Sequence, residues 1–599
     1  MKTNGSRIPS GPTVGAVSRR SVIAGGAALT LAGAAAACSK KAPAPEEGVN
    51  TSVVAQCEKM LDLALTDDER AQIVATIDDQ LEAIRAIRAI DFENGEAPAL
   101  VFNPLLPGQA VPEQSGGVRN AVAAGDLPAG EDDIAFAPAS RQAHWIRTRQ
   151  ISSRELTELY LRRIARYQPL LLNFITVTAD LAREQAARAD EEIAAGHYRG
   201  PLHGLPYGLK DLVATAGIPT TWGATPYKDR VPDRDALIVT RLREAGAVLI
   251  GKTTAGAIAY GDIWFGGKTR SPWNPHEGSS GSSAGSASAT AAGLCSFSIG
   301  TETLGSIVSP SARCGTTGLR PTFGRVPRTG AMALCWSLDK IGPICRSVAD
   351  TALVLDAING GDVSDASAHD IGFAWDAAAA VDGMRIGYSP AWFENAAGPD
   401  RQALEALRSL PVALVEIDLP DWPYNDLFTV VEAEAAAAFQ ELTLSNRDDE
   451  MVWQEDRAWP NTWRRAHFFS AVDYVQIDRL RRRVMKMMAE RMAGLDAVFS
   501  PNFAGNLLVI TNFTGHPCLT QRAGFVDSPT RGLGGASTEQ DSAAPAPTFR
   551  VPENVTLWGP LFEERRLLTL GRALEAATGA ADERPPLERW MEEFGGRAP

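Results

Sequence analysis

The sequence has few cysteines, and none of them is spaced like a metal ligand. Only 7 Cys occur among 599 residues, and no CxxC or Cys/His ligand spacing is present. We therefore predict no metal site and expect no cofactor. Disulfides stay open for the six cysteines that we expect mainly to be small buried apolar residues: Cys57, Cys295, Cys314, Cys335, Cys345 and Cys518.

The chain also lacks an excess of positive charge. Lys and Arg number 58 against 72 Asp and Glu, which gives a formal net charge of −14. Nucleic-acid binding depends on clustered Lys and Arg, so this composition argues against a nucleic-acid partner and favours a small-molecule substrate. No unit of roughly 20–50 residues is repeated, which argues against a solenoid or a propeller.

The N-terminus has no acidic residues. None of the first 45 residues is Asp or Glu, and Arg19 and Arg20 precede an apolar run at 22–37 that is shorter than the roughly 20 residues of a membrane-spanning helix. Residues 1–38 resemble a Tat-type signal peptide, which predicts export to the periplasm; a disordered tail is the alternative. Cys38 follows three alanines and marks either a cleavage site or a degenerate lipobox, so a lipid anchor at Cys38 stays open.

Two parts follow the signal. We interpret 39–133 as a tether and an accessory helical region, in which Thr66–Glu69 matches a capping box. The helix that this box opens is expected to carry one apolar stripe from Ile73 to Ile84. Residues 134–599 alternate helices with short apolar strands, which is typical of an α/β domain.

A serine-rich segment raises the question of catalysis. Residues 277–288 read E-G-S-S-G-S-S-A-G-S-A-S, which is too small and polar to fill a core. No Lys lies between Ser271 and Lys340, so the segment is not a phosphate-binding loop. Neither Ser282 nor Ser306 has the frame of a lipase-type nucleophile elbow. An active serine here needs a base other than the histidine of those enzymes.

A buried lysine is an alternative base. Lys210 lies close to Leu209 and Leu212 in a segment bounded by Gly and Pro. Burial disfavours the charged ammonium, so such a lysine becomes neutral and able to accept a proton. A second hydroxyl from the serine-rich segment would then relay the proton.

Three ordered motifs resemble the amidase signature family. Gly204–Asp211 is similar to its lysine motif, Ser280–Ser286 to its serine loop and Gly300–Pro310 to its nucleophile motif. The likeness covers 134–575 and includes Thr511–Pro517, so it is far more specific than a single serine motif. It implies an α/β fold with a large mixed β-sheet covered by helices on both faces, here with an N-terminal helical extension.

The resemblance implies a Ser–cis-Ser–Lys triad. Ser306 would be the nucleophile, Ser282 the bridging serine with a cis peptide bond before it, and Lys210 the base. The resemblance also implies a supporting role for Ser283 and substrate contacts for Met332 and Trp336. The backbone N–H groups expected to form the oxyanion hole are those of Thr303, Leu304, Gly305 and Ser306.

Three residues depart from the family pattern near the nucleophile. Glu302 stands where the family has Asp, Leu304 where it has Gly, and Val308 where it has Arg. We expect the charge contact of the missing Arg to be rebuilt or lost. A side chain at Leu304 restricts the backbone angles of the predicted oxyanion hole.

Two stretches of the C-terminal half are harder to interpret. The aromatic residues between Trp453 and Tyr474, with Trp459 and Trp463 among them, either line an acyl pocket or form core. Residues 524–548, rich in Gly, Pro, Ser and Ala, are predicted to be a loop.

The leading functional expectation is an exported amidase. It would hydrolyse a carboxylic or peptide C-terminal amide to an acid and an amine or ammonia, through an acyl-enzyme on Ser306. The alternatives are a glutaminase-type subunit of a tRNA amidotransferase and an exported, non-catalytic binding protein on an amidase scaffold. A small amide substrate is the expected partner, and the oligomeric state, including a homodimer, stays open.

Overall fold

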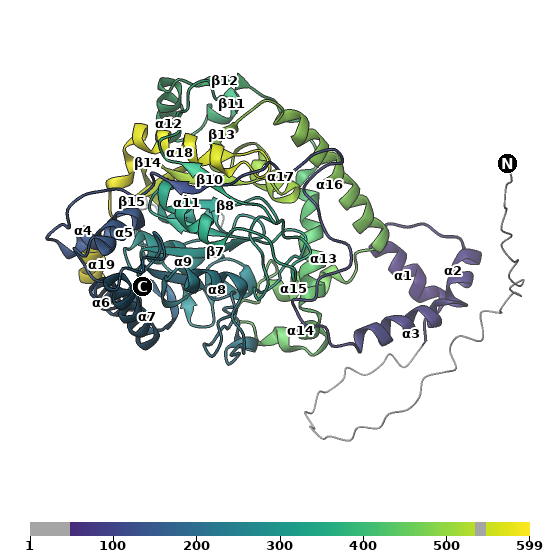
Figure 1. Cartoon of the computed structure of the whole chain (residues 1–599). Coiled ribbons are helices and arrows are strands. Elements are labelled where there is room, and N and C mark those ends of the chain that lie inside the picture. The colour runs from purple at the N-terminus through teal and green to yellow at the C-terminus, as the bar shows by residue number, and fades with distance from the viewer. Residues whose placement is uncertain (1–47, 533–546) are drawn as a thin grey trace, which may run out of the picture. The chain divides into compact units, whose positions relative to one another are not determined.

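The computed structural model of the chain describes residues 48–532 and 547–599, which belong to the unit Glu47–Pro599 (Figure 1). The predicted signal peptide at 1–38 and the lipid-anchor alternative at Cys38 lie outside the described residues.

A large mixed β-sheet organises the unit (Figure 1). Its eleven strands lie in the spatial order β12 (Ala413–Glu416), β11 (Arg385–Tyr388), β13 (Ala497–Pro501), β15 (Thr548–Trp558), β14 (Cys518–Pro529), β8 (Thr317–Arg320), β9 (Lys340–Cys345), β7 (Phe297–Glu302), β3 (Pro206–Lys210), β4 (Val248–Thr253) and β2 (Phe174–Val177). The strands β12, β11 and β13 run parallel, and so do β7, β3 and β4, whereas the remaining neighbours pair antiparallel.

The parallel pairing of β3 and β7 positions the predicted catalytic residues. Their register joins Tyr207 to Phe297 and Leu209 to Ile299. Parallel strands end at the same edge of a sheet, so the carboxyl end of β3 at Lys210 lies beside the carboxyl end of β7. All five residues of β3 are buried, as expected for a central strand covered on both faces.

Helices pack on the sheet in two groups. The helices α9 (Ala284–Ala291) and α10 (Val308–Cys314) contact each other and the strands β7 and β8, respectively. The second group contacts β9, β14 and β15 and consists of α11 (Val348–Ile358), α12 (Gly398–Ser409) and α18 (Glu564–Thr578). The expected sheet flanked by helices is therefore confirmed.

The remaining helices lie around these layers (Figure 1). Those nearest β3 and β4 in the sequence are α4 (Glu131–Phe136), α5 (Ala139–Arg147), α6 (Ser153–Leu171), α7 (Ala179–Ala194) and α8 (Leu237–Glu244). The C-terminal half adds α13 (Phe428–Ala438), α14 (Gln440–Leu444), α15 (Trp459–Ala466), α16 (Ala471–Arg491), α17 (Leu507–Thr514) and α19 (Leu587–Glu593). A second apolar cluster joins α13, α15, α16 and α17 to the nucleophile turn through Leu304.

The accessory region contains three helices: α1 (Thr51–Leu61), α2 (Asp67–Val74) and α3 (Ile77–Arg88). The capping box is confirmed, since Thr66 caps α2 and Glu69 bonds back to it. The prediction of a single stripe-bearing helix was wrong, because the helix breaks between Val74 and Ile77. At the break the Thr76 hydroxyl donates to the carbonyl oxygen of Ile73 at 3.2 Å, which satisfies a carbonyl at the end of α2.

The accessory region is tied to the rest of the unit. The strand β1 (Gly117–Arg119) pairs in parallel with β10 (Ala374–Asp376), and Gln114 Nε2 donates to the carbonyl oxygen of Phe562 at 2.6 Å. A separate two-stranded ribbon is formed by β5 (Ile263–Trp264) and β6 (Gly267–Lys268). The functional division at residue 134 remains a prediction.

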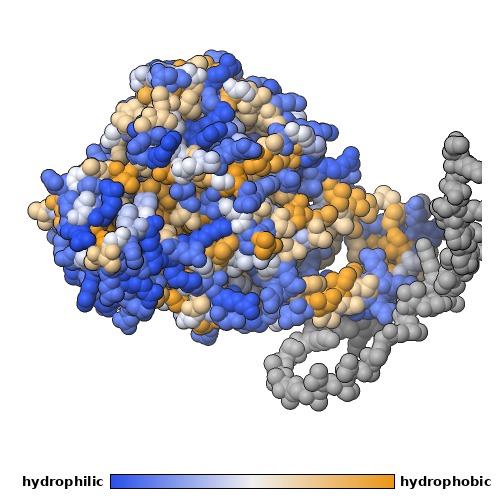
Figure 2. Space-filling view, in the orientation of Figure 1, coloured by the Kyte–Doolittle hydropathy of each residue, from blue (hydrophilic) through white to orange (hydrophobic). Residues whose placement is uncertain are grey.

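Apolar side chains are exposed in the accessory region, and Figure 2 shows hydrophobic surface over α1–α3. The large apolar residues exposed between 51 and 92 are Val53, Met60, Leu63, Ile87, Ile90 and Phe92. Among the described residues, no helix has the length and apolar character to cross a membrane.

The predicted loop at 524–548 was wrong in part. Residues 524–529 continue β14, which pairs with β15 from Cys518↔Trp558 to Pro529↔Thr548. The pairing shifts register between Arg522 and Gly524, where Ala523 is the extra residue of β14, and it resumes at Gly524↔Glu553. Pairing with a neighbouring strand overrides the low strand propensity of Gly and Ser.

The serine-rich segment is partly helical, because α9 begins at Ala284. Its small residues allow close contact with neighbouring backbone. A Cβ at Gly285 would lie 2.2 Å from the carbonyl oxygen of Asn173 and 2.4 Å from Thr254 N. Glycine is therefore required at a helical position where alanine would ordinarily be favoured.

We predict that Gly285→Ala destabilises the protein, although alanine has the higher helix propensity. The added methyl group meets backbone atoms of residues that directly flank β2 and β4, so overpacking of about 1–3 kcal/mol outweighs the propensity gain. Urea unfolding measures the change, with Gly398→Ala as control, because a Cβ at Gly398 contacts nothing within 4 Å. Equal urea concentrations at the midpoint of unfolding for the two variants would contradict the prediction.

Candidate active site

The side chain of Lys210 lies at the carboxyl end of β3 and contacts three hydroxyl groups. Its Nζ is 2.8 Å from Ser282 Oγ, 3.1 Å from Ser283 Oγ and 2.8 Å from Thr301 Oγ1. The side chain is fully buried. The structure thus brings the predicted base into direct contact with the predicted bridging serine.

Burial makes Lys210 able to act as a base. It lowers the pKa of the Lys210 ammonium well below the usual lysine value, and the negative charges of Asp339 and Glu302 raise it only in part. The surrounding hydroxyls hydrogen-bond a neutral amine as well as a charged one, so they do not restore the charge. Burial therefore favours the neutral amine of Lys210, whose lone pair can accept a proton.

The bridging serine lies in a tightly packed turn. The peptide bond between Gly281 and Ser282 is cis, as the resemblance implied. A Cβ at Gly281 would lie 1.8 Å from the carbonyl oxygen of Gly261, so only glycine fits. Ser283 Oγ donates to Thr301 O at 3.0 Å and accepts from Thr301 N at 3.1 Å, which fixes this turn to the end of β7.

Ser306 lies in the turn between β7 and α10. Ser283 N donates to the Ser306 carbonyl oxygen at 3.2 Å, so the two serine-bearing turns are direct neighbours. Within the described ranges, Ser306 Oγ makes no hydrogen bond and faces a cavity. The hydrogen bond between Ser282 and Ser306 that the relay requires is thus not formed in this structure; such bonds often tighten only when substrate binds.

The predicted oxyanion hole consists of unpaired backbone donors. In the part of the chain that the structure describes, the N–H groups of 303–306 donate no hydrogen bond, and all four residues line the cavity. The left-handed backbone angle in this turn falls on Gly305, with φ +91°, and not on Leu304. The restriction expected from the Leu304 side chain is therefore avoided, since glycine occupies the position that needs it.

Glu302 fixes the turn that carries Ser306. Its Oε2 accepts hydrogen bonds from Ile307 N at 2.8 Å and Val308 N at 3.0 Å. Its Oε1 accepts from Arg320 at 2.7 Å and from Asn512 Nδ2 at 2.9 Å. Burial raises the pKa of Glu302, but the charge and hydrogen bonds of Arg320 outweigh it and bring that pKa to about 2.

The charge contact expected near the nucleophile is present in another form. The uncharged side chain of Val308 cannot form an ion pair with Glu302, and Arg320 on β8 supplies the positive charge instead. The second guanidinium nitrogen of Arg320 donates to Thr511 Oγ1 and to the His516 carbonyl oxygen, each at 2.8 Å. The motif at 511–517 thus belongs to the support of the nucleophile turn.

His516 is structural rather than basic. Its Nδ1 lies 2.7 Å from Thr514 Oγ1, and burial lowers its pKa to about 3, so the ring is neutral. No three His, Cys, Asp or Glu side chains gather around a common point in the described ranges as they would around a metal ion.

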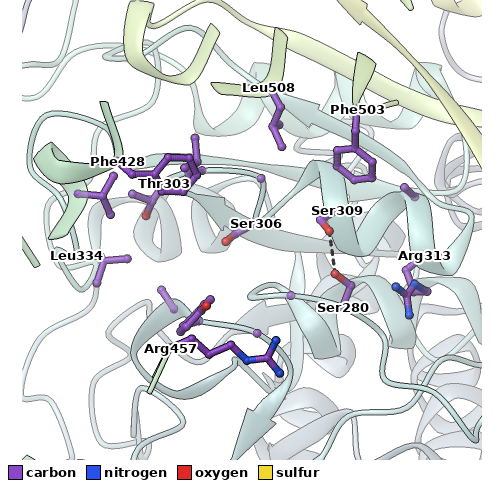
Figure 3. Close-up of a pocket in the computed structure, with 18 of the residues that line it drawn as sticks. Ser280, Thr303, Ser306, Ser309, Arg313, Leu334, Phe428, Arg457, Phe503 and Leu508 are labelled. Atoms are coloured by element: carbon purple, nitrogen blue, oxygen red, sulfur yellow. Dashed lines mark hydrogen bonds between the residues drawn. The ribbon is translucent and has the colours of Figure 1, made fainter. Parts of the chain in front are cut away.

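The first cavity has a volume of about 720 Å³ and contains Ser306 (Figure 3). On one side of Ser306 lies the hydroxyl pair Ser280–Ser309, with the two oxygens 2.8 Å apart. On the other side lie the apolar residues Leu334 and Phe428. The cavity therefore offers a polar and an apolar wall to a group bound at the nucleophile.

The aromatic stretch of 453–474 divides between the two predicted roles. Trp459 lines the first cavity, whereas Trp463 is fully buried and stacks on Trp459 with ring centroids 5.8 Å apart. Met332 and Trp336 do not line the first cavity, and both lie instead in a neighbouring one. Their contact with substrate remains a prediction.

The other serines of the segment serve packing. Ser286 and Ser288 lie within α9 and not in a loop; Ser286 Oγ donates to Ile299 O and Ser288 Oγ to Arg270 O, both at 2.9 Å. Ser279 Oγ donates to the Ser280 carbonyl oxygen at 3.0 Å. Ser280 lines the cavity, which the sequence did not indicate.

Several residues of the site were not predicted from the sequence. Thr301 contacts Lys210, and Arg320 and Asn512 hold Glu302, yet none of them was singled out. Arg320 and Asn512 both lie in motifs that resemble the family, and the unpaired acid Glu302 was the signal that a cation had to be nearby. Because Arg320 and Asn512 are not close to Glu302 along the chain, the sequence alone does not show that they contact it.

The chain belongs to the amidase family, whose sequence model matches residues 155–532, more than half of the chain. Among curated relatives, a putative amidase AmiD of Mycobacterium tuberculosis is 46% identical over 238 residues, which cover 40% of this chain and 50% of the relative. A glutamyl-tRNA(Gln) amidotransferase subunit of Roseiflexus sp. is 42% identical over 301 residues, which cover 48% of this chain and 62% of the relative. The matched stretch thus spans less than two thirds of either relative's own length.

Solved structures extend the likeness to most of the chain. The peptide amidase from Stenotrophomonas maltophilia is 30% identical, with a TM-score of 0.64, and the match covers 75% of this chain and 98% of that one. A bacterial aryl acylamidase, 21% identical with a TM-score of 0.64, shares the fold.

We expect Arg320→Met to destabilise the protein and to lower activity together. It leaves the buried Glu302 carboxylate without its cation, which costs about 3–5 kcal/mol. Urea unfolding and kcat/KM measure the two effects. The double variant Glu302→Gln/Arg320→Met should recover part of the stability, because the Glu302 charge is removed together with that of its partner.

The control is the exposed pair Arg408–Glu405, in which Arg408→Met should cost no more than about 1 kcal/mol. An Arg320→Met protein as stable as Arg408→Met would contradict the role of the buried pair.

The pH profile of kcat/KM should have an acidic limb set by Lys210. Only the neutral amine accepts a proton, so activity is lost as pH falls through the pKa of folded Lys210. Because burial lowers that pKa, the limb should lie well below 10.5. Glu302, with a pKa of about 2, stays ionised over this range.

Lys340 also titrates in this range, because burial lowers its pKa to about 7. The limb should therefore persist in Lys340→Met if Lys210 is its source. A limb centred near 10.5, or one that disappears in Lys340→Met, would contradict the assignment.

Proposed function

We propose that the protein is an amidase that hydrolyses amides through an acyl-enzyme on Ser306. One observation carries the proposal: the buried Lys210 contacts Ser282 at 2.8 Å, beside a turn of four residues that line the cavity of Ser306 and whose backbone N–H groups make no hydrogen bond within the described ranges. This arrangement supports Lys210 as base, Ser282 as relay and the N–H groups of 303–306 as oxyanion site.

Acylation begins with proton transfer along the relay. Lys210 Nζ takes the proton of Ser282, and Ser282 takes that of Ser306, whose Oγ forms a bond to the amide carbon. The carbonyl electron pair moves to oxygen, and the N–H groups of 303–306 stabilise the resulting charge. One such donor is worth about 3–4 kcal/mol.

Breakdown of the intermediate returns the proton. The carbon–nitrogen bond breaks, and the leaving nitrogen takes a proton back through Ser282 from Lys210. Water then attacks the acyl-enzyme, with the same relay as base, and releases the carboxylic acid and free Ser306. The scheme uses side chains and backbone groups of this chain together with one water molecule.

We propose a carboxylic or peptide C-terminal amide as substrate. Support comes from the size of the first cavity, about 720 Å³, which holds a group far larger than a simple acetyl. The likeness to the peptide amidase over 75% of the chain points the same way.

Two alternatives are separable by experiment. A glutaminase-type subunit of a tRNA amidotransferase would hydrolyse glutamine, as the likeness to the Roseiflexus relative permits. A non-catalytic binding protein would not react at Ser306 at all. The ordinary backbone angle at Leu304 removes one reason for that alternative.

We propose export to the periplasm from the N-terminal sequence alone. Cell fractionation with and without residues 1–38 tests it, and protein retained in the cytoplasm in both cases would contradict it.

Ser306→Ala should lower amide hydrolysis by roughly 10⁴-fold or more, because binding and the oxyanion donors alone remain. The same variant should lose labelling by a fluorophosphonate probe, measured by mass spectrometry. The control is Ser409→Ala, a serine exposed at the end of α12. Unchanged hydrolysis in Ser306→Ala would refute the nucleophile, and a folded wild-type protein that neither labels nor hydrolyses amides would support the binding alternative.

A further inference from the structure

The first cavity extends from Ser306 along the helix α10. Ser309, Ala312 and Arg313 line it, and their spacing of three and four residues places them on one face of this helix. Arg313 lies about 6 Å beyond Ser309 along the helix axis, since an α-helix rises about 1.5 Å per residue. Figure 3 shows Ser309 and Arg313 on the same side of Ser306. The cavity therefore has an end that is well separated from the nucleophile.

The strand β15 forms another wall of this end, through Glu553 and Asn554. Asn554 Nδ2 donates to the carbonyl oxygen of Thr316 at 3.1 Å, two residues after the end of α10. The carboxylate of Glu553 is partly buried, forms no ion pair and accepts no hydrogen bond from the residues that the structure describes. A carboxylate taken out of water without a partner costs free energy, which a bound cation would offset. We call this part of the cavity its distal end; it is lined by Arg313, Asn502, Arg531, Glu553 and Asn554.

The arginines of the distal end are bound to another acid. Arg531 donates to the carboxylate of Glu277 from Nε at 3.2 Å and from a terminal nitrogen at 2.7 Å, and Arg313 lies 3.6 Å from the same carboxylate. Burial raises the pKa of the Glu553 carboxyl, and Arg531 and Arg313 lower it only in part. Glu553 thus lacks a cation of its own. The other charged residues on the cavity wall are the ion pair Arg465–Glu432 and the exposed Arg457 and Asp456.

A further acid lies close to Glu553. Burial and the charge of Glu553 raise the pKa of Asp400 to about 7, and the exposed Arg401 lowers it only in part. Asp400 Oδ2 accepts from Ala397 N at 3.1 Å, whereas Asp400 Oδ1 has no hydrogen-bond partner among the described residues. A cation bound at Glu553 would therefore also weaken the repulsion between the two carboxylates.

The distal end also contains an unpaired amide. Asn502 is only 4% exposed, and its Oδ1 accepts from Thr520 Oγ1 at 3.2 Å and from Thr556 Oγ1 at 2.7 Å. Its Nδ2 donates to none of the described residues, and the buried Oδ1 of Asn554 accepts from none of them. One free donor and two free acceptors, the second being Glu553, match a carbonyl oxygen next to an ammonium group. The first residue of a peptide has both groups.

We infer that the protein selects peptide amides with a free N-terminal ammonium group, which Glu553 binds while Asn502 donates to the carbonyl oxygen of the same residue. The inference rests on the proposed function and deepens it, because the C-terminal amide of the same peptide is the group that Ser306 attacks. Two extended residues span about 7 Å, which is similar to the length of α10 that lines the cavity. A dipeptide amide therefore reaches from the nucleophile to the distal end.

The test compares alanyl-phenylalanine amide with its N-acetyl derivative, on the full chain at pH 7. The phenyl ring suits the apolar wall of Leu334 and Phe428. Wild-type kcat/KM should be higher for the free dipeptide amide by about ten- to a hundredfold, as expected for a hydrogen bond to a charged group. Glu553→Gln, which keeps the shape of the side chain, should remove this advantage through a higher KM for the free dipeptide amide.

A second measurement needs no variant. An α-amino group titrates near about 7.7–8.0, so the ratio of the two wild-type kcat/KM values should fall towards one as pH rises above this range. The titration of the enzyme itself cancels in this ratio. Asn502→Ala should lower kcat/KM about threefold or more for both substrates, because each presents the same carbonyl oxygen.

The matched control is Glu394→Gln, which removes an exposed carboxylate that does not line the first cavity and should leave the ratio unchanged. Circular dichroism melts check that each variant is folded. Equal wild-type kcat/KM values at pH 7, a ratio that does not change with pH, or a folded Glu553→Gln protein with the wild-type ratio would overturn the inference and leave the Ser306 mechanism intact. Failure of the proposed function itself would appear as no hydrolysis of either substrate by wild type.

Discussion

The chemistry of the site follows from the desolvation of one lysine. Lys210 is fully buried at the end of a central strand, and within the described part of the chain its amine bonds to hydroxyls and a carbonyl but to no carboxylate. An ammonium there would lose its hydration without gaining an ion pair, so burial lowers the pKa of Lys210 and favours the neutral amine. These neutral partners bind an amine without holding it charged. A serine can therefore be activated here without histidine.

Buried ion pairs stabilise the turns around the site, whereas the predicted base Lys210 has no ion pair within the described part of the chain. The buried pair Arg320–Glu302 lies next to the nucleophile turn, and its hydrogen bonds hold the N–H groups that follow Ser306. Lys252 and Asp211 form a second buried pair, with Nζ 3.5 Å from the carboxylate, and Asp211 directly follows Lys210 in the sequence. Because each charge has its counterion nearby, neither pair offers Lys210 a strong negative partner.

The accessory region contributes to the surroundings of the predicted catalytic residues, although it lies outside the part of the chain that matches the family. The predicted triad lies within the part that matches the family at 155–532, whereas Asn94, which exchanges two hydrogen bonds with Ala333, lies before it. A segment outside the family core thus contributes a wall to a cavity that reaches Thr303. Such an addition can change the shape of the site without altering the strand that carries Lys210 or the turn that carries Ser306.

Local features of the sequence pointed to a buried lysine base and to tight turns in the serine-rich segment. The resemblance to the amidase signature family, carried by the order of its motifs, predicted the triad with Ser306 as nucleophile and the class of fold. The folded chain was needed to show that Arg320 replaces the missing arginine, that Ser286 lies in a helix, and that Asn94 meets Ala333. Each of these depends on contacts between residues far apart in the chain, and pairing or packing across the fold outweighs the local preferences that a sequence expresses.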